Sequence, residues 1–166
     1  FFIRGEGSGQ GEYWLVHLSR HPRAQDVMKQ VHWMHQNHSI HYGGPGLDML
    51  ATHVMGFRQE FTGGFLFDDV AHRLSSEALV QQLADNIYGR SQPVQIGQLY
   101  ASTCNTSPGT SGMYKDVLEK LSGEKDIVIR AEDGTVRRRA RYMRDTDWIE
   151  RNRQGSLFKS PEVLAQ

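Results

Sequence analysis

The chain has 166 residues with 19 basic and 19 acidic side chains, so its balanced charge excludes a global field that would draw it to DNA or to an anionic membrane. The single cysteine, Cys104, excludes an internal disulfide and fits a reducing cytoplasm. One thiol also cannot build a Cys-rich zinc or iron–sulfur site alone. No run reaches the roughly 18 apolar residues of a membrane span. We therefore expect a cytoplasmic protein with no membrane partner.

Composition divides the chain into two parts. All eight histidines lie between His17 and His72, whereas 13 of the 19 basic residues follow Ser75. This shift predicts two units that meet between residues 68 and 76. Because the chain starts at Phe1 and shows no signal-peptide pattern, we interpret it as a fragment of a longer protein.

The first part opens with a glycine-rich segment at residues 5–11. Its spacing matches a phosphate-binding loop, but it precedes a strand instead of joining a strand to a helix, which favours a hairpin or a linker. Residues 13–18 are nearly all apolar and predict a buried strand. A helix is predicted over residues 25–36. Its buried face is expected to consist of Val27, Met28, Val31 and either Met34 or His35.

Glycine and proline make residues 37–52 a turn-rich connection, and the phenylalanine-rich segment 57–67 is expected to be irregular or strand-like. A histidine series with steps of three overlaps this region: His32, His35, His38 and His41. Histidine is the commonest metal ligand, and residues three apart are neighbours on a helix. Three-residue steps drift around a helix, however, and no acidic residue lies within the series. We expect no metal here and keep the four histidines as the alternative.

The second part predicts a run of short elements. A helix capped by Ser75 or Ser76 and closed by Gly89 is followed by a short strand at 93–96, a small helix at 97–103 and a second helix from Ser111 that Gly123 ends. The expected core stripes are Leu79, Val80, Leu83, Ala84 and Ile87 on the first helix, and Tyr114, Val117, Leu118 and Leu121 on the last. A hairpin follows, and this order is typical of a winged helix-turn-helix.

Asp133-Gly134 marks the hairpin turn. If the turn has two residues, Arg130 faces Arg137, and Arg139 and Arg141 share that side. Like charges directly opposite each other destabilise a strand pair, so a phosphate backbone lying against the row would explain it. The alternative is a charged, solvated edge strand. The acidic residues near enough to neutralise the row are Glu132, Asp133, Asp145 and Asp147.

The helix from Ser111, the candidate recognition helix, is not expected to read a base sequence. Its outward residues are Lys115, Asp116, Glu119 and Lys120, which are expected to pair with each other at i, i+4. At its start, Thr110 and Ser111 either donate to a phosphate or cap the helix. The candidate nucleic-acid contacts are therefore Thr110, Ser111, Lys115, Arg130, Arg137, Arg139 and Arg141.

Three stretches in this order resemble the C-terminal part of a bacterial family, the three-Cys-motif partner proteins (TcmP): residues 13–22 with Asp26–Lys29, residues 114–137 and residues 145–149. The family resembles a Rossmann-like methyltransferase domain followed by a winged helix, paired with a three-Cys protein of radical-SAM type. The resemblance implies an α+β fold with three regions. These are residues 1–74 as the strand–helix remnant of the methyltransferase-like domain with a Gly/His-rich linker, residues 75–150 as the winged helix-turn-helix domain, and residues 151–166 as a tail.

The resemblance places any S-adenosylmethionine site and catalytic motif upstream, so we expect no cofactor and no catalytic residue in this chain. The first functional hypothesis is a winged-helix module that binds nucleic-acid backbone for the absent methyltransferase-like half. One alternative is a docking module for the three-Cys partner. The other is a fragment of an S-adenosylmethionine-dependent methyltransferase.

Overall fold

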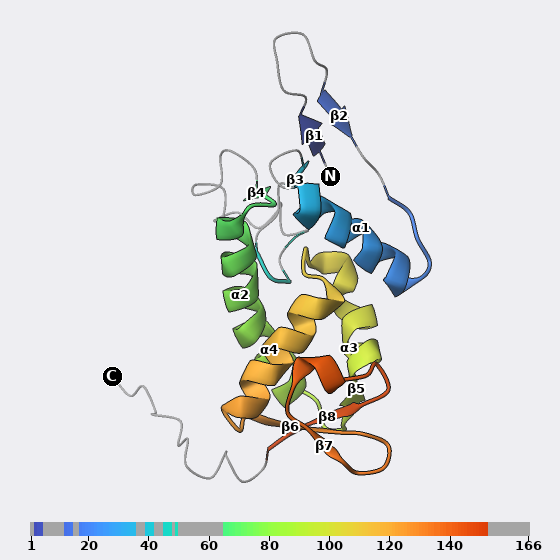
Figure 1. Cartoon of the computed structure of the whole chain (residues 1–166), viewed down its shortest axis with the longest axis vertical. Coiled ribbons are helices and arrows are strands. Elements are labelled where there is room, and N and C mark those ends of the chain that lie inside the picture. Colours follow the sequence, from blue (N-terminus) through green and yellow to red (C-terminus); the bar gives the residue numbers. More distant parts are fainter. Residues whose placement is uncertain are drawn as a thin grey trace, which may run out of the picture.

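The computed structural model describes residues 2–4, 12–14, 17–35, 39–41, 45–47, 49 and 65–152. Helices combine with two antiparallel four-stranded sheets, which gives the predicted α+β fold (Figure 1). The first sheet has the order β2-β1-β3-β4 and consists of β1 (Phe2–Arg4), β2 (Glu12–Trp14), β3 (Ser39–His41) and β4 (Phe65–Leu66). The second has the order β5-β8-β6-β7 and consists of β5 (Val94–Gln95), β6 (Ile127–Arg130), β7 (Val136–Arg137) and β8 (Trp148–Arg151). The helical elements are α1 (Pro22–His35), α2 (Asp69–Tyr88), α3 (Ile96–Thr103), the 3-10 turn η3 (Cys104–Thr106), α4 (Ser111–Gly123) and the 3-10 turn η4 (Ala140–Tyr142).

The first sheet is a set of short antiparallel pairs. β1 and β2 pair from Phe2 opposite Trp14 to Arg4 opposite Glu12, so the glycine-rich segment joins a hairpin as predicted, and its loop lies outside the described residues. A Rossmann-like sheet is mainly parallel. The antiparallel pairs therefore do not show the methyltransferase-like remnant, which stays a prediction.

The predicted buried strand over residues 13–18 is wrong at its end. β2 stops at Trp14, and Leu18 is 89 % exposed. The chain turns at Ser19, whose hydroxyl accepts from the N–H of His21, and the His21 ring accepts from the N–H of Arg23 to start α1. Residues 17 and 18 lie outside any strand.

The predicted buried face of α1 is also wrong. The side chains that lie inward are Asp26, Lys29 and His32, whereas Val27 is 51 % and Met34 75 % exposed. α1 packs on the turn between η3 and α4, which presents backbone N–H and C=O groups. A polar helix face satisfies such groups, and an apolar face would leave them without partners.

α2 begins at Asp69, earlier than the predicted cap at Ser75 or Ser76. Asp68 is the N-cap, because its Oδ1 accepts from the N–H of Ala71 at 2.8 Å, and Ser75 is buried within the helix. The C-terminal boundary at Gly89 is confirmed.

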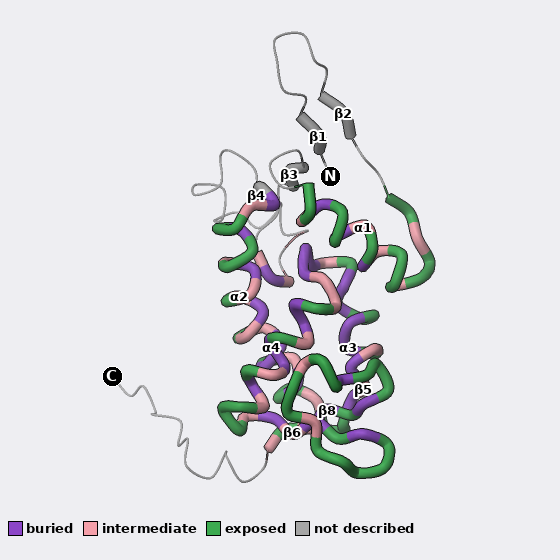
Figure 2. Tube along the Cα trace, viewed as in Figure 1, coloured by how far each residue is buried: buried purple, intermediate pink, exposed green. Residues whose placement is uncertain are grey.

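The hydrophobic core lies between α2, α3, α4 and the second sheet (Figure 2). Both predicted stripes are confirmed, with Leu79, Leu83 and Ile87 buried on α2 and Tyr114 and Leu118 buried on α4. Val80 packs partly buried against the cluster. The segment around Gly46 also lies on α2. Gly46 has φ +68°, and a Cβ there would collide with the Gln82 side chain, so only glycine fits.

The hairpin between β6 and β7 is confirmed, but its predicted register is wrong. Ala131 and Thr135 close a three-residue loop in which Gly134 has φ +82°. Arg130 therefore lies opposite Val136, and Ile129 lies opposite Arg137. One added loop residue moves every β7 side chain to the other face. The expected repulsion between Arg130 and Arg137 does not occur, and Val136 is exposed while Arg137 lies on the inner face.

The strand that completes the second sheet is β8, which pairs with β5 on one side and β6 on the other. The connection from β6 to β8, residues 131–147, is hereafter called the wing; it contains β7 and η4. Arg139 and Arg141 do not continue β7, because β7 ends at Arg137. Ile149 of β8 is buried in the core, whereas Trp148 is 39 % exposed.

Candidate nucleic-acid interface

The N-terminus of α4 is in contact with α1. Thr110 caps α4 by accepting from the N–H of Met113 at 3.2 Å. The backbone N–H and the hydroxyl of Ser111 donate to the two oxygens of Asp26 at 2.6 and 2.7 Å. Asp26 therefore occupies the position where a phosphate would meet the helix N-terminus. The capping alternative is confirmed for Thr110, and Ser111 has its donors engaged within the fold.

Further polar contacts fix α1 to the same turn. Lys29 Nζ donates to the carbonyls of Cys104 at 2.7 Å and Gly109 at 3.2 Å, and Trp33 Nε1 donates to the carbonyl of Pro108 at 2.9 Å. Burial lowers the pKa of Lys29 to about 8, while Asp26 and Cys104 favour its charged form. This network fixes α1 against the turn that precedes α4, at the N-terminal end of the candidate recognition helix.

The outward side chains of α4 hold the wing. Lys115 Nζ lies 3.1 Å from Asp145, and Glu119 accepts from the N–H of Ala140 at 2.6 Å and from Arg139 at 3.2 Å. The backbone N–H of Ala140 is the main cause that lowers the pKa of Glu119. The predicted pairing of these charges within the helix is therefore wrong for Lys115 and Glu119. α4 uses them to position the wing, which leaves little of this face for reading bases.

The arginines that were predicted to form one basic row make separate contacts instead. Arg130 pairs with Glu150 on the exposed side of the sheet at 2.9 Å. Arg137 lies 3.5 Å from Asp147, whose side chain is only 2 % exposed; this is an ion pair without hydrogen-bond geometry. Arg141 lies over the ring of Tyr142, 4.6 Å from its centroid. Of the four predicted acidic neighbours only Asp147 pairs with an arginine of the row, whereas Arg130 and Arg139 pair with Glu150 and Glu119, which were not predicted.

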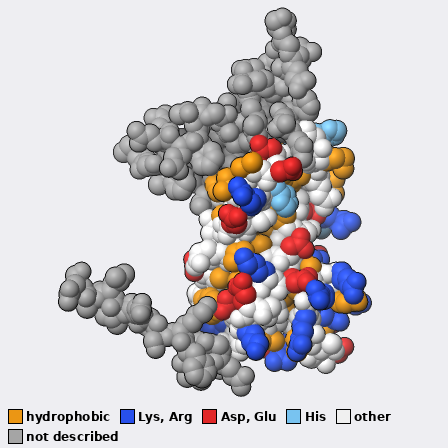
Figure 3. All heavy atoms as spheres, turned by 60° about the vertical axis from the view of Figure 1, so that its left-hand side comes forward, with side chains coloured by type: hydrophobic (Ala, Val, Ile, Leu, Met, Phe, Trp, Pro, Cys, Tyr) orange, Lys and Arg blue, Asp and Glu red, His pale blue; other side chains and the backbone are white. Residues whose placement is uncertain are grey.

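Exposed cations remain on the wing. Arg138, Arg141 and Arg144 are exposed, and within the described residues no ion pair engages them. Figure 3 shows Lys and Arg side chains gathered over the lower end of the molecule, with acidic side chains among them. Sequence reasoning missed Arg138 and Arg144 as candidates. The three-residue turn puts Arg137 on the inner face of the sheet, a place that a two-residue turn would have given to Arg138.

The histidine series does not form a site in the described part of the chain. His32 is buried and stacks on Phe67 with ring centroids 5.2 Å apart, whereas His35 is exposed at the end of α1. Burial lowers the pKa of His32 to about 4, which keeps the ring neutral. His38 and the side chain of His41 lie outside the described residues. Within those residues, no group of three potential ligands is close enough to hold a metal.

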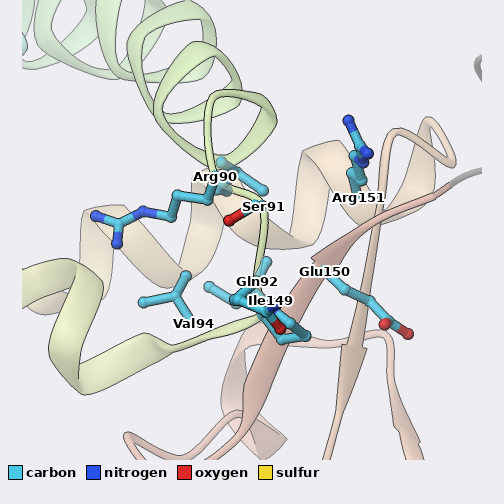
Figure 4. A pocket seen from close by; sticks show the side chains of 9 residues that line it. Arg90, Ser91, Gln92, Val94, Ile149, Glu150 and Arg151 are labelled. Carbon is cyan, nitrogen blue, oxygen red and sulfur yellow. The ribbon is translucent and has the colours of Figure 1, made fainter.

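The hollow beneath the turn from α2 to β5 is a packing crevice. It measures about 40 Å³ and is lined in part by Arg90, Val94, Ile149, Glu150 and Arg151. In Figure 4 the charged side chains extend away from one another instead of converging. A space of this size holds water and not a ligand.

The order of α2, β5, α3, α4 and a sheet closed by a wing defines a winged helix-turn-helix. Residues 56–134 match the family model described as GMT-like wHTH domain, so the chain carries a module of this class. The match leaves the assignment to the three-Cys-motif partner family unconfirmed. The comparisons with curated proteins and with solved structures gave no match. In the part of the chain that the structure describes, none of the helices has the length and apolarity to cross a membrane.

Proposed function

We propose that the winged-helix module binds a nucleic-acid backbone through its wing, without reading the base sequence. The observation that carries this proposal is the set of exposed wing arginines, Arg138, Arg141 and Arg144, none of which has a carboxylate within ion-pair distance among the described residues. Phosphate contacts of this kind give affinity but no sequence information. The chain as a whole is neutral, so binding depends on this local concentration of charge.

Two further arginines can add to the contact. The pairs Arg130–Glu150 and Arg139–Glu119 lie at the surface, where ion pairs contribute little to stability, so a phosphate can replace the carboxylate at little cost. Arg137 is different, because its partner Asp147 is buried. Its substitution would disturb the wing itself and would not test binding.

The test is Arg141→Ala combined with Arg144→Ala, measured by fluorescence anisotropy with labelled duplexes of several sequences at rising salt. The expected result is weaker binding to every sequence, with a salt slope lower by about 2. Arg20→Ala combined with Arg73→Ala is the matched control, since both residues are exposed and lie outside the wing. Equal losses in the two double variants, or no loss in the wing variant, would overturn the proposal.

A second candidate function is docking to a partner protein, and the exposed apolar side chains of α1 and of the segment before it favour it. Val27 and Met34 of α1 are 51 % and 75 % exposed, and Leu18, which precedes the helix, is 89 % exposed. The partner that the family resemblance implies is a three-Cys protein of radical-SAM type. In a co-purification assay, Val27→Asp combined with Met34→Asp should abolish capture of the co-expressed three-Cys protein, while the wing double variant should retain it. The reverse pattern would exclude this function.

The methyltransferase-like half and its S-adenosylmethionine belong to the same proposal and are supported by the resemblance alone. In this arrangement the present chain supplies binding and the upstream half supplies the chemistry. Calorimetry with S-adenosylmethionine on this chain and on a longer form distinguishes the alternatives. Heat from the longer form alone would support the binding module, and heat from this chain would support the methyltransferase fragment.

A further inference from the structure

A hollow of about 420 Å³ lies where the end of α4 meets β6 and the wing, and its lining includes Lys125, Val128, Val136, Arg138 and Asn152. This volume falls in the range of small-ligand sites. None of the lining residues that the structure describes is acidic. The hollow therefore combines two cations with an apolar floor.

Lys125 adopts a backbone conformation that a lysine rarely takes. Its φ is +62°, at the position where a helix commonly ends with glycine or asparagine. The N–H of Asp126 donates to the carbonyl of Leu121 and the N–H of Lys125 donates to the carbonyl of Ser122, which is a Schellman motif. Gly123, the residue expected to end α4, lies before this position. A strained residue that also lines a hollow points to a function for its side chain.

Arg138 differs from the arginines beside it. Arg137 faces the buried Asp147, and Arg139 pairs with Glu119 on α4. Arg138 lines the hollow and is exposed, and no described carboxylate pairs with it. Two such cations favour an anion between them. Val136, which is 42 % exposed, and Val128 offer an apolar surface beside that anion.

We infer that this hollow binds one phosphodiester of a nucleic-acid strand, with Lys125 and Arg138 on the phosphate and the adjoining sugar over Val128 and Val136. The inference rests on the proposed function. It adds a site at the end of α4 that the wing residues Arg141 and Arg144 do not contribute to.

The decisive variant is Lys125→Gly, because it separates stability from binding. Glycine relieves the backbone strain, so the melting temperature should rise, while the lost charge should weaken oligonucleotide binding about five- to tenfold and lower the salt slope by about 1. A lysine with a purely structural role would give a more stable protein with unchanged binding, which would overturn the inference. Lys120→Ala is the matched control, an exposed lysine of α4 outside the hollow.

Chemical-shift mapping with a tetrathymidylate separates this site from the proposed wing contact. Shifts at Lys125, Val128 and Val136 support the site. Shifts confined to Arg141 and Arg144 overturn the site and leave the wing function standing. Shifts confined to the hollow keep the site and refute the wing contact, and the absence of shifts at millimolar oligonucleotide refutes both.

Discussion

Asp26→Ala should release α1 from the winged helix. The Asp26 side chain is 6 % exposed and accepts from Ser111 N–H at 2.6 Å, Ser111 Oγ at 2.7 Å, Gln30 Nε2 at 3.0 Å and Tyr100 OH at 3.2 Å. Removing one partner from a buried charged network costs about 3–5 kcal/mol. The substitution also removes a carboxylate that favours the charged form of the buried Lys29. The cost therefore exceeds that of any single surface contact of α1.

This cost should fall on the docking of α1 and not on the module as a whole. The core cluster of α2, α3, α4 and the second sheet includes no α1 residue among its described members. Hydrogen exchange followed by mass spectrometry should show α1 amides exchanging faster by about 10²-fold to several 10³-fold, because each 1.4 kcal/mol is a factor of ten. The amides in the middle of α4 should keep their protection.

The control is Val27→Ala, which changes an exposed α1 residue and should leave exchange unaltered. Wild-type protection of α1 in Asp26→Ala would show that the carboxylate network does not hold the helix. An equal loss of protection in α1 and α4 would show that the two unfold as one unit, and would refute the reasoning from the separate core.

Three further predictions concern stability. Burial lowers the pKa of Lys29 from 10.5 to about 8, so the unfolded chain holds more protons than the folded chain between these pH values. Urea melts should therefore show the free energy of unfolding rising with pH across this range, by up to about 3 kcal/mol. Lys29→Met should remove the rise. Thr110→Ala should cost about 1 kcal/mol in the same melts, because α4 loses its cap, whereas Thr110→Ser should retain most of that stability. Arg137→Ala should cost more than Arg130→Ala, by about 1–3 kcal/mol, because it leaves the buried Asp147 without its cation; equal costs would contradict the assigned roles.

The second part of the chain could be predicted because its helices pack on apolar surfaces. The stripes of α2 and α4 mark the buried sides directly, with Leu79 and Leu118 fully buried. α1 could not be predicted in this way. Its docking surface is made of backbone polar groups, so its apolar residues lie outside and Asp26 and Lys29 lie inside.

The sequence predicted the wing as the candidate site, but not which of its arginines face inward. Arginine density marked the wing, yet the loop length that decides which arginine faces inward depends on whether Gly134 is the second or the third loop residue. β8 gave little signal because it forms no local hairpin and pairs with β5, a strand far away in sequence. Lys125 carries no sequence signal at all, since only the backbone shows its left-handed conformation.

The position of β8 between β5 and β6 affects the order in which this module folds. β5 has no neighbour in its sheet until Trp148 and Ile149 arrive, so a chain that stopped at residue 134, where the family match ends, would leave a gap between β5 and β6. During synthesis the helices emerge first and can associate, whereas the sheet waits for its last strand. The latest residues of the module are therefore the ones that close it, and cutting the chain inside the wing should leave α2, α3 and α4 as a loosely packed, aggregation-prone intermediate.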